Sequence, residues 1–94
     1  MTGMFDTDFG VLALTPNGGT YTYENGRVTA TNVHQYIMEG TWQQNKAGQK
    51  CEDGTYHGSF VFQFNVDGFT GFYGYCEGPP TAGKWNGKRK SPIQ

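Results

Sequence analysis

Apolar and polar residues alternate along much of the chain with a period of two, in short runs separated by turn-forming residues. This period is typical of half-buried β-strands, whose successive side chains point to opposite faces of a sheet. We therefore predict an all-β fold: an antiparallel up-and-down meander of seven or eight strands, closed into a small barrel or strongly curved around one buried face.

Asn-Gly and Asp-Gly pairs favour two-residue hairpin loops, because both central residues of a type I′ turn need positive φ. Such pairs occur at Asn17-Gly18, Asn25-Gly26 and Asp67-Gly68. The cross-strand pairs that follow are Leu14 with Tyr21, Tyr23 with Val28, Phe62 with Tyr73, and Cys76 with Ser59. A further turn near Asn32 to Tyr36 is ambiguous by one residue. Residues 43–53 read as the longest loop, and a last strand is expected over residues 82–88.

The Asp67-Gly68 hairpin places most of its rings on one predicted core face. That face comprises Phe60, Phe62, Phe64, Val66, Phe69, Tyr73 and Tyr75. Glycine repeatedly precedes an aromatic residue by two positions, as in Gly40-Thr41-Trp42. A glycine there leaves room for a neighbouring ring to lie over the backbone, so we interpret the motif first as a packing device.

Composition supports a core made of rings. Seven Phe, six Tyr and two Trp stand against few aliphatic residues in a chain of 94. This length suits one domain, predicted over residues 1–90, with a tail at 91–94. Because so many rings are needed inside, we expect at least one tryptophan to be mostly buried.

The charge of the chain says little about its function. The net charge of −1 makes nucleic acid an unlikely partner, and the basic residues near the C-terminus favour a solvated segment over a phosphate site. The chain as given shows neither a signal peptide nor an apolar span, so we expect no membrane association and a cytoplasmic location by default.

Several motifs together resemble an uncharacterised small bacterial β module that is sometimes appended to larger proteins. The resemblance covers nearly the whole chain and departs around residues 32–36. Its pieces are Phe5 to Gly10, Gly19 to Tyr23, Asn25 to Arg27, Gly40 to Trp42, Gly58 to Phe62, Asp67-Gly68, Phe69 to Tyr75 and Trp85 to Arg89. The resemblance implies the fold and no activity.

Conventional reactive chemistry is poorly represented. Cys51 and Cys76 could form a disulfide that staples the long loop, or remain free thiols in a reducing compartment. His34 and His57 lack metal-ligand spacing, so neither a metal nor a cofactor is expected. Asp6 and Asp8 resemble a carboxylate pair, but protection of an edge strand is the favoured interpretation.

The remaining candidate is an aromatic platform. Its expected ligand-binding residues are Tyr36, Trp42, Tyr75, Trp85 and Arg89, with Arg27 as a further polar partner. The competing interpretation places these rings in the core. We expect a non-catalytic binding or interaction module for a sugar or small apolar molecule. The alternative is a structural domain that forms homodimers through a sheet edge or aromatic face, and an enzyme is a weaker third possibility.

Overall fold

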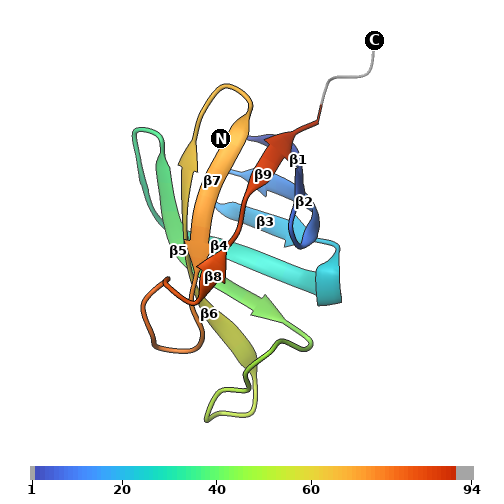
Figure 1. Ribbon diagram of the computed structural model, residues 1–94, viewed down its shortest axis with the longest axis vertical. Helices are drawn as coiled ribbons and strands as arrows, with labels where there is room; N and C mark the ends of the chain where they lie inside the picture. Colours follow the sequence, from blue (N-terminus) through green and yellow to red (C-terminus); the bar gives the residue numbers. More distant parts are fainter. Residues whose placement is uncertain (1, 91–94) are drawn as a thin grey trace.

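The computed structural model describes residues 2–90, so the predicted tail at 91–94 lies outside the described residues. Antiparallel strands account for most of this part (Figure 1). The strands are β1 (Gly3–Thr7), β2 (Gly10–Thr15), β3 (Gly18–Tyr21), β4 (Gly26–His34), β5 (Ile37–Gln44), β6 (Tyr56–Phe64), β7 (Gly68–Tyr73), β8 (Gly83–Lys84) and β9 (Gly87–Arg89).

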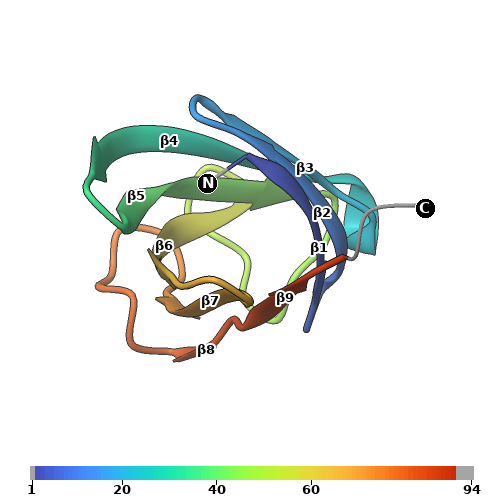
Figure 2. The ribbon, with the colours of Figure 1, turned by 90° about the horizontal axis from the view of Figure 1, so that it is seen from above.

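Seven consecutive strands form a meander, and β9 closes it by pairing with both β1 and β7. The result is an eight-stranded antiparallel barrel with β8 as an extra strand beside β7, which confirms the predicted fold class (Figure 2). The homodimer expectation depended partly on an open sheet, and closure removes that reason. Within residues 2–90, no helix is long and apolar enough to cross a bilayer.

The predicted hairpin registers are wrong by an even number of residues. Leu12, not Leu14, lies opposite Tyr21, and Phe60, not Phe62, lies opposite Tyr73. Val28 pairs with Gly19 instead of Tyr23. An even shift keeps the side chains of paired strand residues on their predicted faces, because the side-chain period of a strand is two.

Each error has the same form: the glycine expected as the second loop residue instead begins the next strand. At the first turn Pro16 and Asn17 form the loop, in keeping with the fixed φ of proline at the first central position of a turn. At the second, a 3-10 turn (η1, Tyr23–Asn25) holds two residues of positive φ before extended Gly26.

At the Asp67-Gly68 turn, the side chain of Asn65 fixes the loop. Its Oδ1 accepts hydrogen bonds from the amides of Asp67 and Gly68. The turn therefore starts before Val66, which is 90% exposed instead of belonging to the core face.

The ambiguous third turn contains Gln35 and Tyr36, between the paired residues His34 and Ile37. A β-bulge between Ala30 and Asn32 adds one residue to β4. This extra residue explains why period-two alternation did not define a register there.

Rings fill the barrel, and six of them lie over a glycine directly opposite on a neighbouring strand. In each case a Cβ added to the glycine would clash with the ring. The pairs are Tyr21 over Gly26, Phe60 over Gly40, Trp42 over Gly58, Phe62 over Gly71, Tyr73 over Gly83 and Phe69 over Gly87. Consecutive Gly-x-aromatic motifs on β5 and β6 thus cover one another reciprocally.

Gly40→Ala should lower the free energy of unfolding by about 1 to 3 kcal/mol, the usual cost of overpacking. The added methyl would meet the Phe60 ring and the backbone of Thr29. Thr41→Ala is the matched control, because the neighbouring side chain is exposed on the outer face and should change stability by less than about 0.5 kcal/mol. Urea unfolding followed by tryptophan fluorescence measures both, and equal stabilities would contradict the packing role of Gly40.

Candidate functional site

One end of the barrel contains a small recess with mainly aromatic walls. Its volume is about 100 Å³. The lining residues are Phe9, Tyr23, Trp42, Gln44, Ala47, Gly48, Tyr73, Tyr75 and Trp85. We call this site the aromatic mouth.

Most ring pairs of the aromatic mouth meet nearly at right angles, whereas Phe9 and Tyr23 are tilted at 49°. Phe9 and Tyr73 cross at 87°, Tyr73 and Tyr75 at 89°, and Trp42 and Tyr75 at 77°, with centroids 5.4 to 5.9 Å apart. These are edge-to-face contacts, in which the positive edge of one ring meets the negative face of the next. The rings therefore brace one another as walls.

Three of the five residues expected in a ligand site line the aromatic mouth: Trp42, Tyr75 and Trp85. Tyr36 does not, because it lies in the turn before β5 whereas Trp42 lies near the end of that strand, roughly 20 Å away at the usual rise per residue. Tyr36 is 72% exposed.

Arg89 also lies away from the mouth. Its guanidinium carbon is 4.8 Å from the centroid of the Phe5 ring, and its Nη1 donates to the Thr2 carbonyl 2.9 Å away. Arg27 is absent from the lining as well. The sequence suggested both arginines as polar residues of the site because of their charge. No strand register was available to show where they lie.

The lining residues missed from the sequence come mostly from turns. Phe9 lies in the turn between β1 and β2, and Tyr23 lies in η1. Tyr73 was assigned to the core, and it packs partly against the core as well as lining the mouth. In the sequence, the Phe9-Gly10 pair at a turn was the only signal that could have indicated Phe9 as a lining residue.

Both tryptophans are buried, Trp42 with 3% and Trp85 with 1% of its surface exposed, so the expectation of at least one buried tryptophan is confirmed. The indole N–H of Trp42 donates to the Gly74 carbonyl at 3.0 Å. Within residues 2–90, the indole N–H of Trp85 has no hydrogen-bond partner. The two indoles thus provide one bonded and one unbonded N–H beside the same recess.

Tyrosine hydroxyls and Gln44 supply the polar groups at the mouth. The Tyr21 hydroxyl donates to Oε1 of Gln44, whose Nε2 donates to the Lys46 carbonyl. Burial raises the pKa of Tyr21. Burial and then the neighbouring Tyr75 phenol raise the pKa of Tyr73.

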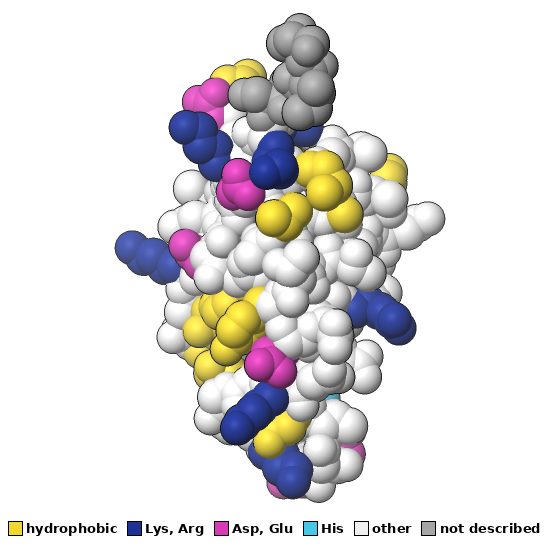
Figure 3. Space-filling view, turned by 90° about the vertical axis from the view of Figure 1, so that its right-hand side faces the viewer, with side chains coloured by type: hydrophobic (Ala, Val, Ile, Leu, Met, Phe, Trp, Pro, Cys, Tyr) yellow, Lys and Arg dark blue, Asp and Glu magenta, His cyan; other side chains and the backbone are white. Residues whose placement is uncertain are grey.

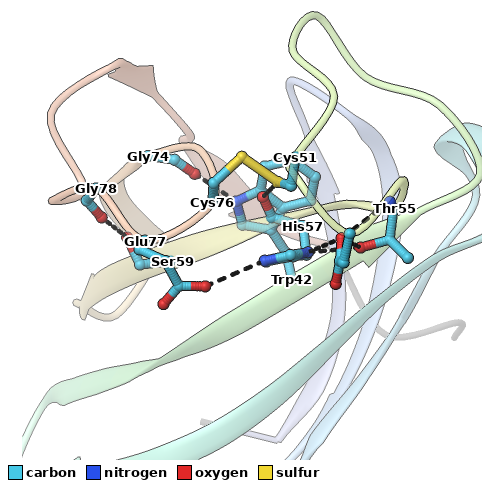
Figure 4. Close-up of a disulfide and its surroundings, with 10 residues drawn as sticks. Trp42, Cys51, Thr55, His57, Ser59, Gly74, Cys76, Glu77 and Gly78 are labelled. Carbon is cyan, nitrogen blue, oxygen red and sulfur yellow. Dashed lines mark hydrogen bonds and ion pairs between the residues drawn. A yellow bond between two sulfur atoms is a disulfide. The ribbon is translucent and has the colours of Figure 1, made fainter.

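A disulfide joins Cys51 to Cys76 (Figure 4), and both cysteines are close in sequence to residues that line the mouth. Cys51 belongs to the loop that also supplies Ala47 and Gly48, and Cys76 directly follows Tyr75. Cys76 lies opposite His57, not Ser59, and its amide donates to the His57 carbonyl at 2.7 Å. The disulfide therefore connects two segments that contribute lining residues to the mouth.

His57 lies beside the disulfide within a polar cluster (Figure 4). Its Nδ1 is 2.7 Å from the Thr55 hydroxyl, and its Nε2 is 3.5 Å from a Glu77 carboxylate oxygen. The Thr55 hydroxyl donates to Asp53 at 2.7 Å, so its proton is directed to a carboxylate instead of to the histidine. That bond and the Thr55 amide lower the pKa of Asp53. The cluster orders the loop and lacks the proton path of a nucleophile and base.

The other sequence candidates have structural contacts. Lys90 Nζ lies 3.4 Å from Asp6, and Asp8 accepts from the Asn86 amide at 2.9 Å, which ties β1 to the closing segment. His34 is exposed at the end of β4. Across residues 2–90, no three His, Cys, Asp or Glu side chains are grouped to hold a metal ion.

The loop between β5 and β6 lies at the lower end of the molecule in Figure 1, and it supplies Ala47 and Gly48 to the lining of the mouth. On the side shown in Figure 3, hydrophobic side chains form one group near the upper end and another in the lower half, both bordered by charged residues.

No protein-family model, curated protein or solved structure matches the chain. The functional argument therefore depends on the site itself.

The Cys51→Ser/Cys76→Ser variant should unfold with a free energy about 3 to 4 kcal/mol lower, from the chain entropy of closing about 25 residues. Reductant should destabilise the original chain equally and leave the variant unchanged. Urea titrations with and without reductant test this, and a reductant-insensitive original chain would contradict a stabilising disulfide.

Alkaline pH should destabilise the fold through Tyr21 and Tyr73. Their raised pKa values mean that both phenols stay protonated in the folded chain after they ionise in the unfolded chain, at about pH 10. Their contribution is complete below that pH and is lost as pH rises toward the folded pKa. Denaturant titrations above pH 9 should show a smaller slope of stability with pH for Tyr21→Phe, with Tyr36→Phe as the exposed control.

Proposed function

We propose that this chain is a non-catalytic binding module whose aromatic mouth accepts one small apolar group of a ligand. The observation that carries the proposal is a recess left open among rings that elsewhere pack tightly, with ring walls from turns and strands together. Concave, mainly aromatic sites with a few polar groups are the usual form of small-molecule sites.

The size of the recess limits what it can hold. Pockets for whole drug-sized molecules measure about 300 to 1,000 Å³, and an engineered cavity of about 150 Å³ holds benzene. At about 100 Å³, the mouth suits a single compact group, with the rest of the ligand outside. A complete sugar ring would have to lie on the rim.

The chemistry of the lining favours binding over catalysis. Tyrosine is the only titratable residue among the nine that line the mouth. General acid and base catalysis needs groups whose pKa lies near the working pH, whereas burial moves the pKa of Tyr73 upward. The proposal therefore assigns the mouth no reaction.

The two indole N–H signals of a ¹⁵N-labelled protein provide the test. Titration with choline and with 3,3-dimethylbutan-1-ol, which present the same compact shape, should produce saturable shifts of the Trp42 and Trp85 signals with at least one compound. A folded protein whose indole signals respond to neither compound would overturn the proposal.

A variant that fills the recess supplies the specificity control. Gly48→Leu extends a side chain from a point where an added Cβ would lie 2.9 Å from the Tyr75 hydroxyl. It should abolish the shifts. Phe72→Leu changes a 47% exposed ring on the outer face and should leave them intact.

A further inference from the structure

The aromatic mouth has walls suited to one kind of cation. We infer that its ligand group is a quaternary ammonium, such as a trimethylammonium head group. This inference rests on the proposed function and adds the chemical class of the ligand. It follows from three properties of the mouth: the ring walls, the absence of charge in the lining, and the volume.

The ring walls supply the attraction. Six of the nine lining residues are aromatic. The face of each ring is electron-rich and attracts a cation within about 6 Å of its centroid. Because adjacent walls stand nearly perpendicular, a compact cation can meet rings on several sides. A trimethylammonium group suits this arrangement, because its charge is spread over three methyl groups that point in different directions.

The lining also selects against ordinary ammonium groups. A primary ammonium carries three N–H donors that need acceptors when they leave water. The side-chain acceptors in the lining are the Gln44 carboxamide oxygen, which already accepts the Tyr21 hydroxyl, and the neutral hydroxyl oxygens of the lining tyrosines, and none is a carboxylate. A quaternary ammonium has no N–H, so it loses no hydrogen bond on entry.

No lining residue competes with or repels such a cation. The lining contains no lysine or arginine that could occupy the ring faces or oppose a positive ligand. In the part of the chain that the structure describes, the arginine that stacks on a ring is Arg89, and it does so on Phe5, which is not part of the mouth. The ring faces of the mouth are therefore not taken by a cation of the described chain.

The volume agrees with the same group. A trimethylammonium head has fewer heavy atoms than benzene, which binds in a cavity of about 150 Å³. The mouth measures about 100 Å³. The head group would enter, and the chain that carries it would leave through the opening.

Three soluble probes separate charge, shape and hydrogen bonding: choline, its neutral isostere 3,3-dimethylbutan-1-ol, and ethanolamine. Titrations followed by the indole N–H signals should give choline a dissociation constant at least about tenfold lower than that of the isostere, which corresponds to about 1.4 kcal/mol. Ethanolamine should bind at least as weakly as the isostere.

Tyr75→Leu tests whether a ring face supplies the preference. Leucine keeps an apolar wall, so the isostere should still bind, whereas the preference for choline should fall at least about threefold. Phe72→Leu should preserve that preference. A purely structural effect of Tyr75 would weaken both probes equally and leave their ratio unchanged.

The outcomes distinguish the inference from the proposed function. Equal or tighter binding of the isostere would overturn the quaternary ammonium and leave an apolar site in place. Failure of all three probes with the folded protein would overturn both. Co-sedimentation with phosphatidylcholine vesicles, competed by choline, would assign the head group to a lipid. Choline binding without co-sedimentation would assign it to a free solute, and either result supports the quaternary ammonium.

Discussion

The contact on which this barrel depends is an aromatic ring lying over a glycine of the neighbouring strand. A strand residue with a Cβ would hold the ring away from the backbone, so each glycine lets one large side chain cover two strands. A chain poor in leucine and isoleucine can thereby fill a small barrel with rings. Both partners of the contact lie directly opposite one another in the ladder.

Aromatic rings in strands and aromatic rings outside strands pack in different ways. Rings such as Phe60 and Phe62 lie in strands, cover glycines and are completely buried. Phe9, Tyr23 and Tyr75 lie outside the strands, have no glycine opposite them in a ladder, and gather at one end. The mouth therefore combines rings that the repeating contact does not use with Trp42 and Tyr73, which cover Gly58 and Gly83.

This division explains what the sequence predicted and what it did not. Alternation identified the buried face of Phe60, Phe62 and Phe64 correctly, because the face depends only on whether a position is odd or even. It could not detect a shift by two, which needs the turn conformation. Pro16 and Asn65 determined two of those turns through a fixed φ and a side-chain cap. The sequence identified Trp42, Tyr75 and Trp85 as site candidates, and these residues line the mouth. It also proposed Tyr36 and Arg89, which lie elsewhere. The end of the barrel at which a residue lies depends on the strand register, which alternation alone does not define.

The opening of the mouth is a consequence of small residues more than of the rings. Ala47 and Gly48 face the aromatic wall from the loop after β5, and a larger side chain at either position would occupy the recess. A flexible loop would not hold such an opening, since apolar walls in water gain by closing on one another. The disulfide ties the loop at Cys51 to Cys76, and the Trp42 indole ties β5 to the Gly74 carbonyl in the same segment. These two links hold the loop, β5 and the segment that carries Tyr75 in fixed relation, so the recess between them can persist without a ligand.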